Sequence, residues 1–439
     1  MEFNPNSKVR NTENQEESSP GDFWLRLDNA AKIYPAVKDR ELTSVFRISV
    51  ELIERVKAKP FLEAIQAIEN RFPYFKVKLK AGFFWYYLEY ENLPIQVKTD
   101  QDIPCRAFHP NELMYRVLAK ENRISVEFSH ILTDGTGAFE FLKSLLFTYF
   151  EKCCHTLPDK LTYYRPNEPA AREEYEDAFN RYFAKSNSPI IKVPNSFHLN
   201  FPLRPKPRFD VLIAIIPLNE LRVKAKEFKV SITEYLIAVY LFSLQTIYYK
   251  LPPLTRRRSN KIVRIEVPLN LRKMYPTKTM RNFSLYVMPE IDLRLGQYTF
   301  EEIIKTVYHQ MQLETDKKLI NKMISRNVSS ERNPFIRSIP LVLKSIVMAR
   351  LYAWATSGYS GVITNLGKVN LTPEMNNLIK RFVFIPPPPN KILKVNCGVV
   401  GFDNNLVLSF GNITTSKEME QHFFTFLTSQ GIPVKIEKY

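Results

Sequence analysis

Residues 123–140 read RISVEFSHILTDGTGAFE, and this stretch does most to decide the fold. Over 123–129 apolar side chains alternate with polar ones, a pattern that predicts a β-strand. The strand runs directly into His130, and beyond Gly135-Thr136-Gly137 a helical pattern extends over 138–152. A histidine at the end of a strand, shortly before a helix, lies where a rigid scaffold can present a side chain to a cleft.

His130 is the candidate for chemistry in this stretch. An imidazole acts as a base when one ring nitrogen is held and the other is left free for a substrate. Asp134, four residues further on, can hold the ring directly or can pair with a distant arginine and fix the loop. Gly135 would let the backbone turn sharply and would leave room for a ligand. Alone, the pattern is typical of a structural histidine, and its position between strand and helix favours a functional one.

The rest of the chain mixes strands with a few helices in two similar halves. Strands are predicted at 43–52, 74–80, 83–90, 113–119, 209–216, 262–268, 283–290, 360–364, 391–400 and 404–411. Helices are predicted at 58–72, 170–185, 219–228, 299–325 and 416–430, and another, capped by Ser231 or Thr233, through 248. We therefore expect an α+β fold of two lobes with mixed sheets and flanking helices.

The same pass predicts where the lobes begin and end. Residues 1–20 are polar and are expected to be disordered. An N-terminal lobe at 21–160 carries the histidine motif, a Pro- and Tyr-rich connection spans 161–205, and a C-terminal lobe covers 206–439.

Charge and cysteine content limit the function classes. The 439 residues hold 62 Lys+Arg against 45 Asp+Glu, and this formal charge of +17 attracts anionic partners. The basic residues are scattered and no nucleic-acid motif accompanies them, so we do not expect a nucleic-acid partner. The spacing of the four cysteines (105, 153, 154 and 397) fits neither a zinc site nor a redox pair, and no metal is expected.

Targeting signals are not evident in the sequence. The N-terminus lacks the apolar core of a signal peptide, and no stretch reaches the roughly 18 uncharged apolar residues of a membrane span. The nearest is 339–355, which Lys344 and Arg350 interrupt, and it predicts a buried or interfacial helix. We expect a cytoplasmic protein with reduced thiols.

HILTDG at 130–135 resembles the HxxxDG motif of the chloramphenicol-acetyltransferase-like superfamily. That group includes peptide-synthetase condensation domains, plant acyltransferases and bacterial alcohol acetyltransferase-like proteins. The opening FWLRLDNAAKIYPA (23–36) looks like the start of the last of these branches. VPLNLRKMYP (267–276) with RNFS (281–284), and ITNLG (363–367), resemble later segments of the superfamily, so the similarity covers about 20–435.

The resemblance implies two lobes around a central active-site tunnel, which an acyl thioester and an acceptor enter from opposite sides. His130 would be the general base that deprotonates an alcohol or amine acceptor. Asp134 and Gly135 would be structural, with Arg272 as the partner of Asp134. Asn282, with Asn365 behind it, would contact the substrate or its oxyanion, although either asparagine could equally fix a turn. No bound cofactor is implied; acyl-CoA or acyl-phosphopantetheine would be the co-substrate.

Departures from the superfamily patterns limit which branch of the superfamily the sequence resembles. Ser129 precedes His130 where many condensation domains have a second histidine, which favours a stand-alone acetyltransferase, and RNFSLYV replaces the late aromatic-glycine motif of the plant enzymes. Three alternatives stay open. The donor could be an acidic carrier protein docked on the basic surface; the chain could be a non-catalytic binding protein of the same fold; and 335–355 could make peripheral membrane contact. A monomer is expected.

Overall fold

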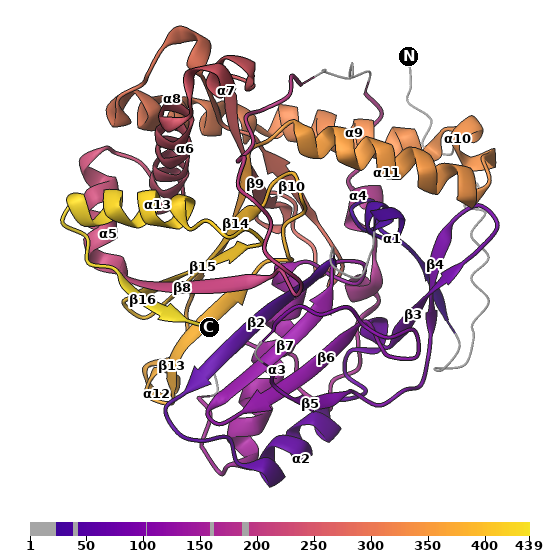
Figure 1. Cartoon of the computed structure of the whole chain (residues 1–439). Coiled ribbons are helices and arrows are strands. Elements are labelled where there is room, and N and C mark those ends of the chain that lie inside the picture. The colour runs from indigo at the N-terminus through magenta and orange to yellow at the C-terminus, as the bar shows by residue number, and fades with distance from the viewer. Residues whose placement is uncertain (1–22, 38–42, 102, 159–161, 187–192) are drawn as a thin grey trace, which may run out of the picture.

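The computed structural model describes residues 23–37, 43–101, 103–158, 162–186 and 193–439. The segment predicted to be disordered, 1–20, lies outside these ranges. Within them, the strands form three sheets, of five, eight and three strands (Figure 1). The two large sheets form the two lobes, and the lobe boundaries drawn from the sequence stay a prediction.

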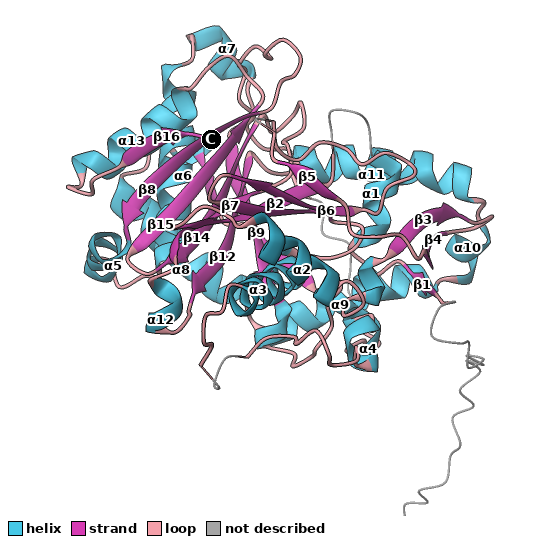
Figure 2. Cartoon of the chain, turned by 90° about the horizontal axis from the view of Figure 1, so that it is seen from below, coloured by secondary structure: helices cyan, strands magenta, loops and turns pink. Residues whose placement is uncertain are grey.

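The N-terminal lobe is built on the five-stranded sheet, whose strand order is β13-β2-β7-β6-β5. Its strands are β2 (Val45–Leu52), β5 (Val97–Thr99), β6 (Tyr115–Lys120), β7 (Arg123–Ser129) and β13 (Ile379–Ile385). Helices α2 (Ala58–Ile68) and α3 (Gly135–Lys152) lie together on one side of this sheet (Figure 2). Phe128 of β7 packs against Phe141 of α3, with ring centroids 5.4 Å apart. The apolar side of the predicted strand therefore faces the core, as its alternation indicated.

The polar side of the same strands is buried as well. Arg47 of β2 donates to Glu127 of β7 at 2.8 Å and to Asp100 at 2.7 Å. It also donates to the hydroxyl of Tyr439, the last residue of the chain, at 2.8 Å. Buried charges persist when they are paired in this way. The sheet thus lies between two layers, and the C-terminus covers its polar face.

The C-terminal lobe is built on the eight-stranded sheet. Its strands are β8 (Asp210–Pro217), β9 (Ile262–Asn270), β10 (Ser284–Val287), β11 (Glu290–Asp292), β12 (Gly361–Val369), β14 (Val395–Phe402), β15 (Asn405–Asn412) and β16 (Lys435–Lys438). Most pairs are antiparallel, but β12 is parallel to both β9 and β14. The lobe's helices include α5 (Leu218–Glu227), α6 (Ile232–Lys250), α7 (Pro253–Arg258), α8 (Phe300–Glu314), α12 (Pro373–Asn376) and α13 (Glu418–Ser429).

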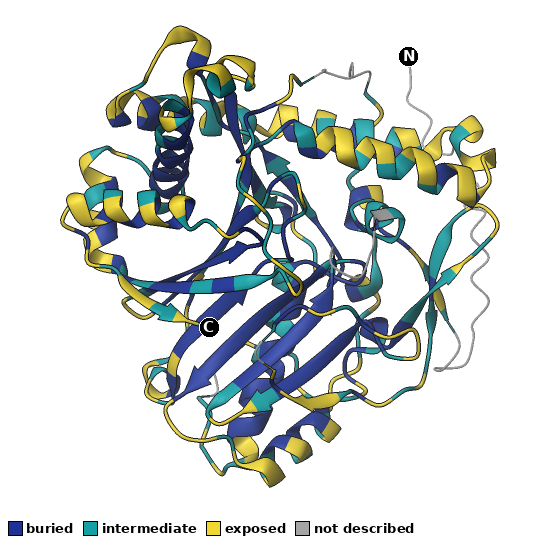
Figure 3. Ribbon diagram, viewed as in Figure 1, coloured by how far each residue is buried: buried dark blue, intermediate teal, exposed yellow. Residues whose placement is uncertain are grey.

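Helix α6 is the buried centre of that lobe (Figure 3). It begins with a reciprocal cap: Ser231 Oγ accepts from the Glu234 backbone N–H at 3.2 Å, and the Glu234 carboxylate accepts from the Ser231 N–H at 2.6 Å. Of the two candidate caps, Ser231 is therefore the one used. In the described part of the chain no single helix is long and apolar enough to cross a bilayer. Helices α5 and α6 together meet that test by length and composition, but they are bent by 81°.

One strand of the first sheet comes from far along the chain. After β12 the chain crosses over, forms β13 in antiparallel pairing with β2, and returns as β14. The sequence analysis did not predict a strand at 379–385, although Phe382, Val383, Phe384 and Ile385 are all buried there. The C-terminal half thus completes the N-terminal sheet.

The third sheet and several helices lie beside these lobes. The strands β1 (Trp24–Arg26), β3 (Val77–Ala81) and β4 (Tyr86–Tyr90) form a small antiparallel sheet. The pairing of β3 with β4 confirms the hairpin predicted from 74–90. The remaining helices are α1 (Tyr34–Val37), α4 (Ala178–Arg181), α9 (Lys317–Arg332), α10 (Pro334–Ser338) and α11 (Leu341–Ser357).

Two helix predictions were wrong in extent. The helix predicted at 299–325 is two helices, α8 and α9, because Asp316 accepts a hydrogen bond from the Lys318 N–H and starts a new helix there. The helix predicted at 170–185 is replaced by a 3-10 turn at Arg172–Tyr175 and the short α4. Glu174 in that turn is buried and bonds Arg71 and Tyr74, so tertiary contacts outweigh the local helical tendency.

Candidate functional site

His130 follows β7, and its backbone and ring are both held. Its N–H donates to the Ser44 carbonyl at 2.8 Å, immediately before β2. Tyr34 of α1 stacks on the imidazole with a centroid distance of 5.4 Å and an interplanar angle of 15°. Phe46 of β2 lies 4.5 Å from it at a tilt of 42°. Two aromatic rings therefore fix the orientation of the histidine ring.

Asn282 completes the setting of His130. Its Oδ1 lies 3.5 Å from His130 Nδ1, a long contact on one edge of the ring. Its Nδ2 donates to the His130 carbonyl at 2.9 Å and to Asp28 Oδ2 at 3.0 Å. Both amide hydrogens are thus engaged. The structure brings Asn282 to His130, and a contact of Asn282 with the substrate or its oxyanion stays a prediction.

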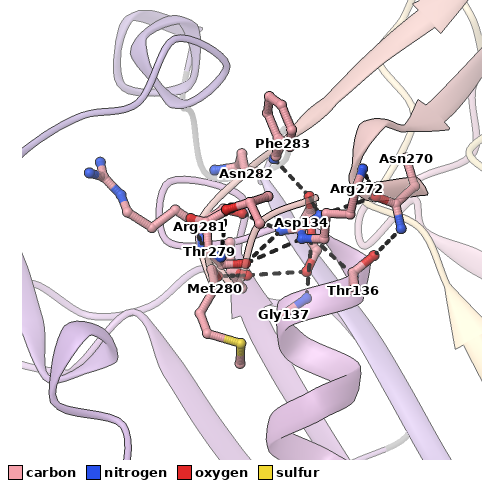
Figure 4. A network of polar contacts seen from close by, with 12 residues as sticks. Asp134, Thr136, Gly137, Asn270, Arg272, Thr279, Met280, Arg281, Asn282 and Phe283 are labelled. Carbon is pink, nitrogen blue, oxygen red and sulfur yellow. Dashed lines mark hydrogen bonds and ion pairs between the residues drawn. The ribbon is translucent and has the colours of Figure 1, made fainter. Parts of the chain in front are cut away.

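Asp134 is the centre of a hydrogen-bond network that ties the two lobes together (Figure 4). As the N-cap of α3, its Oδ1 accepts from the Thr136 and Gly137 N–H groups at 3.1 and 3.2 Å. Its Oδ2 accepts from the Arg272 guanidinium at 2.7 Å and from the Phe283 N–H at 2.9 Å. The carboxylate therefore does not touch the imidazole of His130 but fixes the loop that carries it.

Arg272 is the partner of Asp134 that the sequence suggested. Its guanidinium also donates to the Thr279 carbonyl at 3.2 Å and to the Arg281 carbonyl. Burial by itself would raise the pKa of Asp134, but Arg272 and the hydrogen bonds outweigh it and hold that pKa below the usual range. Asp134 is thus a charged anchor between α3 and the segment 270–283.

A side chain at either Gly135 or Gly137 would collide with a neighbouring residue, and the colliding atoms differ between the two positions. Gly135 is the first residue of α3 and does not have positive φ. The prediction that its conformational freedom permits a sharp turn is therefore wrong. Instead, a Cβ on Gly135 would lie 2.5 Å from a methyl group of Leu366. A Cβ on Gly137 would lie 2.5 Å from the Met280 carbonyl oxygen, which also accepts from the Thr133 hydroxyl at 2.6 Å. Close approach of the two lobes excludes a side chain at Gly135, and at Gly137 the hydroxyl of Thr133 excludes it together with the Met280 carbonyl.

The electrostatic setting keeps His130 neutral. Burial lowers the pKa of the imidazole, and Asp134 and Asn282 act in the opposite direction without cancelling it. Burial likewise raises the pKa of Asp28 to about 6, although Arg281 and Asn282 favour its charged form. A neutral imidazole near pH 7 has a ring nitrogen with a free lone pair, as a general base requires.

Asn365 is not part of this arrangement. It lies on β12, where its Nδ2 donates to the Thr233 hydroxyl at 2.9 Å and its Oδ1 accepts from the Gly367 N–H at 2.8 Å. These bonds fix the bulge in β12, which is the turn-fixing role left open for it. Its neighbour Leu366 is the residue that reaches Gly135.

A cavity of about 450 Å³ lies between segments of the two lobes. Its lining includes Thr43 and 103–106 from the first half of the chain, and 207–209, Tyr352 and 388–392 from the second half. Thr43 adjoins Ser44, whose carbonyl accepts from the His130 N–H. The cavity thus approaches the histidine through Thr43, and His130 itself is not among its lining residues.

Sequence reasoning missed several residues around the histidine. Asp28 and Tyr34 both lie in 23–36, the segment that carried part of the resemblance, but nothing in their spacing linked them to His130. Glu266 lies on β9, and burial raises the pKa of its carboxyl; Tyr359 is within hydrogen-bonding reach of it. Only the tertiary structure places these groups together.

Comparison with known proteins yields the fold. No model of a known protein family matches the chain, and no curated protein matches it in sequence. Polyketide synthase associated protein 5 from Mycobacterium tuberculosis matches in structure at 11% identity with a TM-score of 0.57, covering 92% of this chain and 97% of that one. The epimerization domain of tyrocidine synthetase B matches at 10% identity with a TM-score of 0.58, covering 94% and 97%.

The wax ester synthase/diacylglycerol acyltransferase of Marinobacter aquaeolei VT8 matches at 12% identity with a TM-score of 0.53, covering 92% of this chain and all of that one, 100%. At such identities these similarities show the fold alone. They extend over nearly the whole chain and confirm the predicted class, an α+β fold of two chloramphenicol-acetyltransferase-like lobes. A shared fold does not establish a shared function, which depends on the residues of the site.

Proposed function

We propose that the chain is an acyltransferase that moves an acyl group, in our proposal acetyl, from a CoA thioester to an alcohol or amine, as alcohol acetyltransferase-like enzymes do. The observation that carries the proposal is the neutral imidazole of His130, held between Tyr34 and Phe46 with Nδ1 against Asn282.

In the proposed reaction, Nε2 of His130 takes the proton of the acceptor hydroxyl or amine. The acceptor oxygen or nitrogen bonds to the thioester carbonyl carbon and forms a tetrahedral intermediate. Collapse of the intermediate breaks the carbon–sulfur bond, and the departing thiolate takes up the proton that His130 received from the acceptor. General-base assistance of this kind contributes roughly 10²–10⁴-fold to the rate.

The cavity between the lobes supports a phosphorylated thioester as donor. Arg106, Arg208 and Lys391 lie in its lining, beside the prolines of 388–389. Cations at the mouth of a pocket attract phosphate groups, and guanidinium groups bind them through paired hydrogen bonds. Acyl-CoA would be a co-substrate, and the proposal requires no bound cofactor.

A carrier protein is the alternative donor. Its phosphopantetheine would use the same cavity, and several structural neighbours are condensation domains, among them that of the Monacolin K polyketide synthase (12% identity, TM-score 0.56). A non-catalytic binding protein of this fold is the remaining alternative. The fully bonded Asp134 and the oriented His130 favour an enzyme over that reading.

The test is thiol release from acetyl-CoA in the presence of a panel of alcohols and amines. We expect release that depends on an acceptor, and we expect His130→Ala to lose about 10²-fold or more of it while remaining folded. The matched control is His309→Ala on the exposed face of α8, which should retain full activity. Equal turnover by His130→Ala and the parent would refute the proposed base, and release only from carrier-bound thioesters would assign the donor to the alternative.

A further inference from the structure

Helix α11 exposes an apolar face to solvent, in contrast to the usual arrangement of a surface helix. Val342, Leu343, Ile346, Val347, Leu351 and Trp354 are between 47% and 74% exposed. They follow each other at helical spacing, so they form one continuous stripe. The buried side of the helix, which includes Leu341, Lys344 and Thr356, faces the protein. Figure 3 shows α11 at the periphery with its outward side exposed.

The stripe continues onto neighbouring segments. Phe335 of α10 is 83% exposed, and Ile339 follows it directly before α11. Phe83 and Phe84, at the tip of the β3–β4 hairpin, are exposed as well. The Phe83 carbonyl accepts from the Leu341 N–H at 2.9 Å, so the hairpin tip is fastened to the start of α11. We call these residues of α10, α11 and the hairpin tip the α11 surface.

The hairpin is held in place by an inward-pointing cation. Lys344 Nζ donates to the Phe84 carbonyl at 3.0 Å and to the Arg337 carbonyl at 3.2 Å, and it lies 3.6 Å from the centroid of the Trp85 ring. The one lysine of α11 is therefore turned away from the exposed stripe, which leaves Arg350 as the one charged side chain on the exposed side of the helix. By contrast, the exposed side of α9, the preceding long helix, carries Lys317, Lys318 and Lys322.

Charge indicates what covers this surface. From 332 to 373 the sequence has no Asp or Glu, while Arg337 and Arg350 lie beside the apolar stripe. No described carboxylate forms an ion pair with either arginine. A second copy of the chain would bring the same cations face to face, at an electrostatic cost. The segment 1–22 is mostly polar and too poor in large apolar side chains to cover the stripe.

We propose that the α11 surface docks on an anionic lipid bilayer, with α11 lying in the plane of the interface. An apolar stripe with aromatic side chains and flanking arginines is the composition of helices that lie at the boundary between head groups and acyl chains. Anionic lipid attracts each nearby basic residue and so adds to the apolar contribution. This proposal is independent of the acyl-transfer reaction.

The test is flotation of the full chain with vesicles of phosphatidylcholine, alone or mixed in equal parts with phosphatidylglycerol. We expect flotation with the mixed vesicles, and about 100-fold weaker partition for the triple variant Leu343→Ser, Val347→Ser, Trp354→Ser. The matched control is Leu254→Ser, Leu295→Ser, Leu313→Ser, which removes three even more exposed apolar side chains from other surfaces. The control should float as the parent does.

Two further measurements make the outcome decisive. Arg337→Gln with Arg350→Gln should reduce the preference for anionic over neutral vesicles, and added salt should have the same effect. The proposal is overturned if the parent does not float with the mixed vesicles, or if the triple variant floats equally well. It is also overturned if the triple variant instead converts a dimer into a monomer in sedimentation, because the surface would then bind a second copy.

Discussion

Removal of the Asp134 carboxylate should cost far more stability than removal of an ordinary helix cap. Asp134→Ala deletes the N-cap of α3, a loss of about 1 kcal/mol. It also leaves Arg272 without its anion, although both side chains are nearly buried, at 12% and 8% exposure. An unpaired buried charge costs about 3–5 kcal/mol, and the remaining carbonyl partners of Arg272 favour the lower end. We expect a total near 4 kcal/mol in the free energy of unfolding.

Urea denaturation followed by circular dichroism measures this loss. Asp316→Ala is the matched control, because Asp316 caps α9 through the Lys318 N–H on an exposed surface and should cost only about 1 kcal/mol. Since the pKa of Asp134 lies below its usual range, its contribution is present above the unfolded value near 4 and is lost as the pH falls through the folded value. The difference between parent and variant should therefore shrink in acid.

The result that would refute this reasoning is equal destabilisation by Asp134→Ala and Asp316→Ala at pH 7. A double-mutant cycle gives a second check. When Arg272→Met is combined with Asp134→Ala, the double variant should be more stable than the sum of the single losses predicts, because no charge is left unpaired. Additive losses would show that the two residues do not act as a pair.

Three further predictions concern the same site. The acid limb of kcat/KM should lie below pH 6.5, because burial lowers the pKa of His130 and only the neutral ring accepts a proton. An inflection at or above pH 6.5 would contradict this. The variant Asp28→Asn, measured in the same series, separates the titration of Asp28 from that of His130. Asn282→Ala should lower kcat and move the acid limb to still lower pH, because Asn282 favours the charged imidazole. If the acid limb does not move, Asn282 does not position His130. Gly137→Ala should cost about 1–3 kcal/mol by urea denaturation, and more than Gly135→Ala, because it meets a backbone carbonyl and not a methyl group that can rotate away.

Much of the fold could be predicted because the deciding patterns are local. The alternation before His130 and the cap at Ser231 each depend on neighbours within a few residues, and both are present in the structure. The pair Asp134–Arg272 spans 138 positions and was reached only through the family resemblance. Spacing and composition alone would not have selected Arg272 among the basic residues.

The rest of the site could not be predicted because it depends on long-range packing. Asp28 and Asn282 are 254 positions apart, and their hydrogen bond exists only once both lobes are assembled. The sequence could suggest a substrate or oxyanion contact for Asn282 from its position, but it could not show that its amide also bonds Asp28 and the His130 carbonyl. The strand β13 was missed for a related reason: the short segment 379–385, which Lys380 and Arg381 interrupt, becomes a strand because the edge of β2 accepts it.

Strand β13 also bears on how the chain folds during synthesis. The edge of β2 that it covers includes Ile48, Val50 and Leu52, all buried in the finished protein. The ribosome must deliver some 330 residues after β2 before residue 385 emerges and can pair with this edge. Throughout that interval the nascent N-terminal half presents an open strand edge of the kind that promotes aggregation. The first sheet is therefore complete only after most of the second half of the chain has been made.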